Sequence, residues 1–264
     1  MERLPRPPPH LAPRAVPVTD VAPLLGEGGC LGAVADVHVA ATTAPTMEEL
    51  GQDFGYVFYR CKVPGPAEGC FHLRRVHDRA NVFLDGRQIA VYYRNDPTSQ
   101  TPRVTIPAEG AELGLLVENM GRVNYGPALG FDAKGICEDV ALEWLALSGW
   151  EAWSLTLDNP DGRFAFAPFK APLVDRPAFY LAEFEVDSPA DAWLEFPGVH
   201  GAVWLNGHPI GRYWEVGPAK TLYLPGCWMR KGANRLVVFE TERLVRGRLR
   251  LVDKPELGPP TLRD

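Results

Sequence analysis

Several carboxylate side chains have the residue type needed for acid–base or nucleophilic chemistry. The candidates are Glu118, Glu138, Asp139, Glu195 and Glu215. Such chemistry needs two carboxyls in one cleft, one with a raised pKa and one with a lowered pKa. Glu118 has Arg79 and Arg122 as cationic candidates for pairing, and ion pairs of that kind are common at surfaces and in loops. We therefore expect ordinary ion pairs here and no independent catalytic site.

Two pairs of residues have side chains suited to contact with a sugar. Asn124 and Tyr125 lie in a loop after the predicted strand 115–118, and Arg212 and Trp214 end a later apolar segment. Aromatic faces stack on the C–H face of a sugar ring, while Arg and Asn side chains bond to its hydroxyls. The structural alternatives are a tyrosine that anchors its loop and large aromatic residues that pack between domains.

The potential metal ligands do not form a recognisable site. His77 and Asp78 precede one hairpin and His200 precedes another, without a third ligand at short spacing. The five cysteines contain no CxxC pair, so no zinc site is expected. We see no dense Asp/Asn cluster for Ca²⁺ and expect no metal and no cofactor. Cys61 and Cys70 could face each other across a hairpin, and the alternative is free thiols.

Composition narrows the class of partner. The chain has 264 residues, a formal net charge of −6 and a sequence pI near 5.6, which argues against a nucleic-acid partner. It has no apolar run of about 18 residues, so we expect no membrane span. The Pro- and Arg-rich start, residues 1–17, lacks the apolar centre of a secretory signal, and we therefore expect a cytoplasmic protein.

Short apolar segments between turn residues predict strands in most of the chain. The counts of Gly and Pro are 26 each, and these residues are spread along the sequence. Asp85-Gly86 separates the apolar runs 80–84 and 87–93. This dipeptide predicts a two-residue hairpin, because a type I′ turn needs positive φ at both central residues. Many short strands with frequent turns favour a sandwich or a barrel.

The strand pattern recurs about 121 residues later. Phe58-Tyr59 matches Phe179-Tyr180, and VFLDGRQI at 82–89 matches VWLNGHPI at 203–210, both at an offset of 121. Leu116-Val-Glu118 matches Val238-Phe-Glu240 at an offset of 122. In this alignment Trp204 takes the place of Phe83 and is expected in the core. A period this long indicates duplicated domains, because solenoid repeats are shorter.

We therefore predict an all-β protein of two tandem jelly-roll sandwiches of the galactose-binding-domain type. The predicted divisions are a Pro-rich linker at 1–34, a first sandwich at 35–150, a connector at 151–177, a second sandwich at 178–254 and a tail at 255–264. A barrel of eight βα units is excluded, because it needs about 250 residues of alternating strand and helix.

The segments that carry the repeat also resemble a known family. They are MEELGQDFGYVFYR at 47–60, VHDRANVFLDG at 76–86, LLVENMGRVNYG at 115–126, FPGVHGAVWLNGHPIGRYW at 196–214 and GPAKTLYLPG at 217–226. They resemble the jelly-roll domains that follow the catalytic barrel of family 35 β-galactosidases, over roughly residues 47–240. Enzymes of that family hydrolyse terminal β-linked galactose with retention and use two glutamates at the mouth of an N-terminal barrel.

The resemblance implies an accessory role. The barrel and its two glutamates are missing from this sequence, so we expect no activity from the chain alone. The expected partners are the catalytic barrel and, through it or weakly, a β-galactoside. In the resembled family the loop with Asn124 and Tyr125 faces the mouth of the barrel, so Tyr125 would help to wall the sugar pocket. The alternatives are a free-standing carbohydrate-binding module and a folded remnant without a ligand.

Overall fold

The computed structural model describes residues 9–258 and divides the chain into two compact units. The first sandwich consists of Leu31–Leu157. The second sandwich combines the residues up to Cys30 with those from Asp158 onward. The first sandwich is therefore an insertion in the sequence of the second. Among the described residues, no helix is long and apolar enough to cross a membrane.

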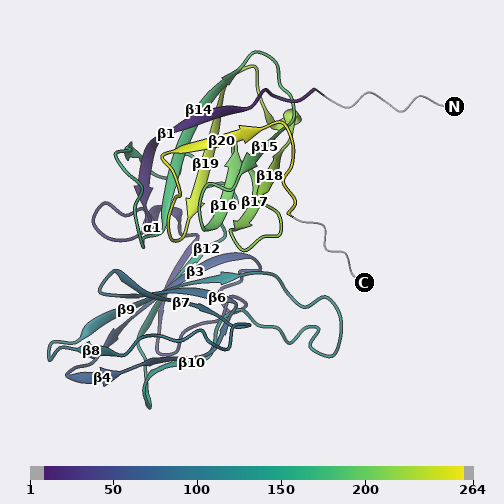
Figure 1. The fold of residues 1–264 in the computed structure, drawn as a ribbon. Coiled ribbons are helices and arrows are strands. Elements are labelled where there is room, and N and C mark those ends of the chain that lie inside the picture. Colours follow the sequence, from purple (N-terminus) through teal and green to yellow (C-terminus); the bar gives the residue numbers. More distant parts are fainter. Residues whose placement is uncertain (1–8, 259–264) are drawn as a thin grey trace. The chain divides into compact units, whose positions relative to one another are not determined.

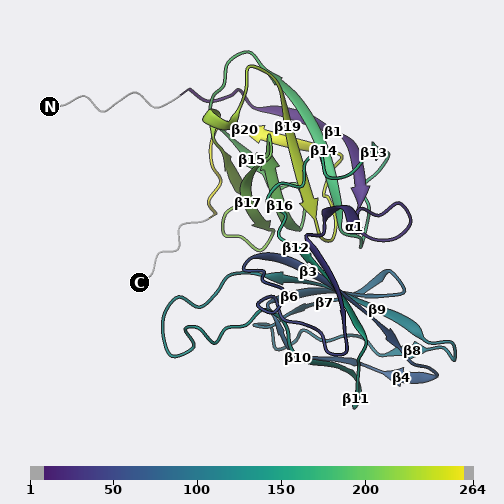
Figure 2. The same ribbon diagram turned by 180° about the vertical axis from the view of Figure 1, so that it is seen from behind.

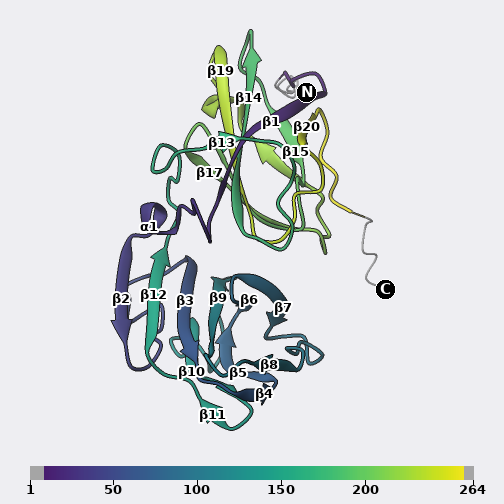
Figure 3. The same ribbon diagram turned by 90° about the vertical axis from the view of Figure 1, so that its left-hand side faces the viewer.

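The main sheet of the first sandwich has six antiparallel strands in the order β2-β12-β3-β9-β6-β7, which Figure 3 shows side by side. These strands are β2 (Val37–Ala41), β3 (Gly55–Val63), β6 (Arg79–Leu84), β7 (Arg87–Tyr93), β9 (Ala111–Asn119) and β12 (Trp150–Leu155). The short helix α1 (Leu31–Val34) precedes β2. In the middle of the sheet, β3 and β9 pair over their full lengths, from Gly55 opposite Asn119 to Val63 opposite Ala111.

Two smaller sheets complete the first sandwich. Their strands are β4 (Ala67–Gly69), β5 (Phe71–His77), β8 (Val104–Ile106), β10 (Gly135–Leu142) and β11 (Leu145–Ala146), in the orders β11-β10-β5 and β4-β8. The core combines Tyr59, Val82 and Leu115 from the main sheet with Phe71 and Val140 from the opposing one. Burial of such side chains stabilises the sandwich by about 1.5–3 kcal/mol each.

The second sandwich repeats this architecture, and its sheet follows the order β17-β16-β19-β14-β1-β20-β15-β18 (Figures 1 and 2). Its elements are β1 (Arg14–Pro23), β13 (Ala167–Pro168), β14 (Ala178–Val186), β15 (Ala192–Glu195), β16 (His200–Leu205), β17 (His208–Trp214), β18 (Thr221–Leu224), the 3₁₀ helix η1 (Gly226–Trp228), β19 (Gly232–Glu240) and β20 (Arg248–Val252). The predicted class, all-β with two tandem jelly-roll sandwiches, is confirmed.

Both predicted hairpins are present. Asp85 and Gly86 join β6 to β7 with φ of 49° and 75°, and Asn206 and Gly207 join β16 to β17 with φ of 51° and 83°. Each hairpin also carries an irregularity two residues before the end of its first strand, at Val82/Phe83 and at Val203/Trp204. The turn residues therefore determine the hairpin in the same way in each sandwich.

The strand registers confirm the internal repeat and correct one detail of it. Phe58 lies opposite Leu116, and Phe179, 121 residues after Phe58, lies opposite Phe239, 123 residues after Leu116. The offset between the copies at 116–118 is thus 122 residues in the sequence match but 123 in the structure. The segment from β7 to β9 and the equivalent segment from β17 to β19 differ in length. Similar side chains at neighbouring positions concealed this difference in the sequence match.

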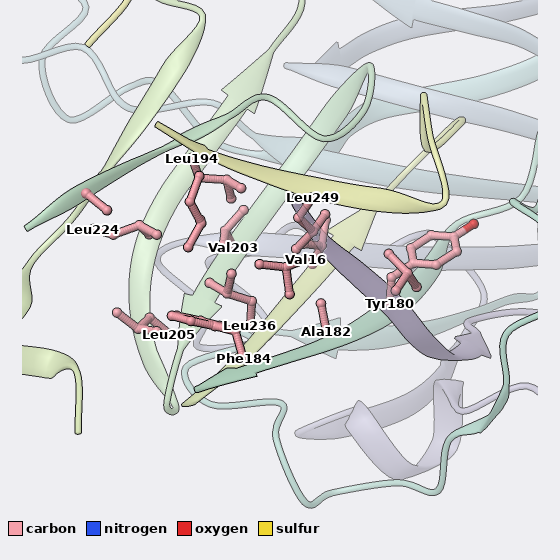
Figure 4. Close-up of a cluster of buried hydrophobic side chains, with 14 of the residues drawn as sticks. Val16, Tyr180, Ala182, Phe184, Leu194, Val203, Leu205, Leu224, Leu236 and Leu249 are labelled. Atoms are coloured by element: carbon pink, nitrogen blue, oxygen red, sulfur yellow. The ribbon is translucent and has the colours of Figure 1, made fainter. Parts of the chain in front are cut away.

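The structure differs from the predicted linker at 1–34. Residues Arg14–Pro23 form β1, which pairs first with β20 and then with β14. Val16 is buried opposite Leu249, and Figure 4 shows both side chains within the core of the second sandwich. Pro17 ends the pairing with β20 and is the last residue before β1 changes partner, a position where a missing backbone donor is tolerated.

The boundary between the sandwiches also differs from the predicted one. The connector was expected at 151–177, but Trp150–Leu155 is β12, which pairs with β2 and β3 of the first sandwich. In the second sandwich, β1 takes the equivalent place beside β14. One copy therefore fills this position with its last strand, and the other fills it with the first strand among the described residues. A linear alignment of the copies does not reveal this difference.

Candidate functional site

The loop of residues 120–134, between β9 and β10, carries exposed apolar side chains. Tyr125 is 90% exposed, Phe131 80% and Leu129 58%, and Asn124 beside them is also exposed. We call Tyr125, Leu129 and Phe131 the loop patch. The exposed ring excludes the alternative in which Tyr125 anchors the loop.

The base of this loop is fastened by a buried network of charges. The Nζ atom of Lys134, which is fully buried, lies 2.8 Å from Oδ1 of Asp78 and 2.9 Å from Oδ2 of Asp132. Nη1 of Arg94 lies 2.9 Å from Oδ1 of each carboxylate. The backbone N–H of Met120 donates to Oδ2 of Asp78 at 2.7 Å. The two ends of the loop are thus held to the same pair of carboxylates.

The carboxyl of Asp132 shows how strongly the network favours its charged form. Burial by itself raises its pKa, but hydrogen bonds from Arg94, from Lys134 and from the N–H of Val123 outweigh burial and hold the pKa well below its usual range. The charge network could not be predicted from the sequence, because nothing around Lys134 in the sequence indicates that its side chain is buried. Because of this network, the base of the loop is fixed while its tip is exposed.

The aromatic cluster around Arg212 lies on β17 of the second sandwich. Trp204 is buried, as expected for a core residue, and Tyr213 is buried as well. Arg212 is exposed, and the half-buried ring of Trp214 meets His200 edge-on, with ring centroids 5.3 Å apart. Asn124 and Tyr125 thus belong to one sandwich and Arg212 and Trp214 to the other. Sugar contact by either pair stays a prediction.

Glu240 is a fully buried carboxyl that the sequence did not single out. Its Oε2 accepts a hydrogen bond from the Tyr213 hydroxyl at 2.7 Å, and its Oε1 accepts bonds from the N–H groups of His200, Glu242 and Arg243 at 3.2, 2.9 and 3.1 Å. Burial raises the pKa of Glu240 to about 7, and these hydrogen bonds offset only part of that effect. The group ties β16, β17 and β19 together.

This burial predicts a pH-dependent contribution to stability. Between the ordinary pKa of 4.5 and about 7 the folded chain holds a proton on Glu240 that the unfolded chain releases, so the free energy of unfolding falls as the pH rises through this window. Glu240→Gln should remove this contribution, and the difference in stability from the parent should change by up to about 3 kcal/mol between pH 4.5 and 8. Urea unfolding at several pH values measures it.

The exposed Glu185→Gln variant is the control for this titration. It should keep the pH profile of the parent protein. A Glu240→Gln variant whose profile runs parallel to that of the parent would contradict the assignment.

The carboxylates considered for catalysis are mostly engaged in ion pairs or exposed. Oδ2 of Asp139 lies 3.1 Å from Nη1 of Arg74, and Oε1 of Glu195 lies 3.4 Å from Nη1 of Arg250. Glu118 is buried directly opposite Arg79 on the neighbouring strand. Arg122 instead pairs with Glu48, and Glu138 and Glu215 are exposed.

The five cysteines are free thiols, so Cys61 and Cys70 are not joined. Within residues 9–258, no group of three or more His, Cys, Asp or Glu side chains could hold a metal ion.

Each of the two sandwiches matches a known domain family. Residues 45–156 match the family model for the first all-β domain of β-galactosidase, and residues 177–234 match that for the galactose-binding domain of β-galactosidase. Two all-β domains of these kinds fit a fragment of a glycoside hydrolase. The chain belongs to the β-galactosidase family through these two domains.

Curated relatives agree with this placement. β-Galactosidase of Xanthomonas manihotis is 34% identical over 218 residues, which are 82% of this chain and 36% of that protein. β-Galactosidase-1-like protein 3 of Mus musculus is 34% identical over 259 residues, 89% of this chain and 37% of the relative. Human β-galactosidase is 35% identical over 225 residues, 75% and 32% respectively. The chain spans little more than a third of the first two relatives' lengths.

Proposed function

We propose that the chain is the non-catalytic accessory region of a β-galactosidase-like glycoside hydrolase, which braces the catalytic barrel. The loop patch carries this proposal. Large apolar side chains exposed together on a soluble protein mark an interaction surface, and Tyr125 and Phe131 are 90% and 80% exposed. The buried Lys134 network holds both ends of the loop that carries the patch, which lowers the entropy cost of docking.

The same loop would complete one wall of the galactose pocket. Tyr125 would offer its ring to the C–H face of the sugar, and Asn124 would offer an amide to a hydroxyl. Both side chains are exposed on the loop, so the other walls of such a pocket must come from the catalytic domain. Arg212 and Trp214 are a second candidate for sugar contact, from the second sandwich.

The alternative is a free-standing carbohydrate-binding module. A module of that kind holds its aromatic side chains in a concave site with a polar rim, where most of the ligand is buried. The aromatic side chains of the loop patch project into solvent instead, which favours docking of a protein partner over independent capture of a sugar.

Galactose binding by the purified chain separates the two functions. We expect a dissociation constant on the order of millimolar or weaker, about −4 kcal/mol, because a single wall buries little of the ligand. Amide NMR shifts during titration with galactose and lactose measure this, and Tyr125→Ala should weaken the interaction further. Micromolar binding that survives Tyr125→Ala would reject the accessory role and favour a binding module.

A further inference from the structure

A second surface of interest is an open hollow of about 430 Å³ on the second sandwich. Residues of β1 and β20 line it. These two strands run side by side in the second sandwich (Figures 1 and 2). Four arginines line the hollow, together with one carboxylate and a few apolar residues. We call this surface the arginine groove, and its defining residues are Arg14, Glu195, Phe196, Arg246, Arg248 and Arg250.

The strand register explains how arginines gather there. Val16 and Leu249 are paired and buried in the core, so their neighbours along the two strands face outward. On that outer face Arg250 lies opposite Ala15 and Arg248 lies opposite Pro17. These two partners have short side chains without charge, so they leave room above the sheet for the guanidinium groups.

The charges of the groove are only partly balanced. Arg250 pairs with Glu195 at 3.4 Å, and Nη1 of Arg14 donates to the carbonyl oxygen of Glu185 at 2.8 Å. Among the described residues, Arg246 and Arg248 have no hydrogen bond or ion pair with a carboxylate, and both are exposed. The groove is therefore locally cationic in a chain whose net charge is −6.

We propose that the arginine groove binds the oxyanion group of a small acidic saccharide. A guanidinium presents its N–H donors as a planar fork that matches a carboxylate or a sulfate. The half-buried ring of Phe196 supplies apolar surface for the C–H face of the sugar. The volume suits one or two sugar rings.

The extent and charge of the groove favour a small ligand over a nucleic acid. Nucleic-acid binding relies on a basic face that neutralises many phosphates. Here the four arginines line a single hollow, and Glu195 lies among them. The chain as a whole is acidic. The groove is built from the second sandwich alone, so this proposal does not depend on the loop patch of the first.

Galacturonate and galactose are a matched pair of probes, because they share a ring and differ in the carboxylate. We would titrate each into the full chain at low ionic strength and follow the Nε–H NMR signals of the arginine side chains. Galacturonate should shift the signals of Arg246 and Arg248, and galactose at the same concentration should not. Inorganic sulfate should compete with galacturonate. The double variant Arg246→Gln/Arg248→Gln should weaken galacturonate binding at least tenfold.

Arg230→Gln, which removes an exposed arginine outside the groove, is the control and should bind galacturonate like the parent protein. Several results would overturn the proposal: no shift with galacturonate, equal binding of galactose, sulfate binding without galacturonate binding, or unchanged affinity in the double variant. An oligothymidylate that binds more tightly than galacturonate would assign the groove to nucleic acid instead. None of these results bears on the loop patch, whose variants are tested separately.

Discussion

Removal of residues 1–30 should unfold the second sandwich and leave the first one folded. The deletion takes away β1, whose buried Val16 and Val18, with Leu11 before it, belong to the hydrophobic core of the second sandwich. Their burial contributes roughly 5–9 kcal/mol, which is comparable with the whole stability of a typical domain, about 5–15 kcal/mol. The deletion also leaves β14 and β20 without the strand that both of them pair with.

Amide NMR spectra of the deletion variant measure this effect. Dispersed signals from residues 31–157 should persist, while those from 158–258 should collapse. A pair of point variants on β1 makes the test independent of truncation: Val16→Asp should unfold the second sandwich, and Ala15→Asp, exposed on the same strand, should not. Native spectra for the deletion variant and for Val16→Asp would show that β1 is dispensable.

Lys134→Met should destabilise the first sandwich by about 3–5 kcal/mol, the usual cost of removing one partner from a buried ion pair. The substitution leaves Asp78 and Asp132 with Arg94 as their remaining cationic partner. Both carboxylates then stay buried with less compensation of their charge. The depressed pKa of Asp132 means that the network stabilises the fold at neutral pH and loses this effect only in strong acid.

Urea unfolding at pH 7 measures the loss, with Lys62→Met as the control. Lys62 is exposed on β3 of the same sandwich, so its substitution should change the stability by less than about 0.5 kcal/mol. In Lys134→Met the signals of residues 120–134 should also broaden or shift. If the two variants were equally stable, the network would not fasten the loop.

Local sequence chemistry was sufficient to predict the hairpins, the repeat and the strands that carry the repeat. Asp85-Gly86 and Asn206-Gly207 each fix a turn through their own backbone preferences, and flanking apolar residues select the strands. These features depend on neighbours in the sequence, so they can be read without the tertiary structure. The resemblance to β-galactosidase domains rested on the same segments, and the family matches at 45–156 and 177–234 confirm it.

The features that could not be predicted depend on contacts between residues far apart in the sequence. The many prolines before residue 18 suggested a linker, yet β1 pairs with strands more than 150 residues later. Lys134 is buried because Asp78 lies 2.8 Å from its Nζ, and nothing in the sequence near either residue indicates that contact. The exposure of Tyr125 likewise follows from the position of its loop, and its residue type alone was compatible with an anchor.

The most direct test of the accessory role is the activity of a chimaera. The matching region of the Xanthomonas manihotis β-galactosidase would be replaced by this chain, and kcat/KM would be measured with an aryl β-galactoside. We expect turnover by the chimaera and none by the chain alone. The double variant Tyr125→Ser/Phe131→Ser should lower kcat/KM at least tenfold, and Trp144→Ser, which removes another ring that is 90% exposed, should leave it unchanged. Unchanged kcat/KM in the loop-patch variant, or turnover by the chain alone that Glu118→Gln abolishes, would show that the chain is not an accessory region that docks through the loop patch.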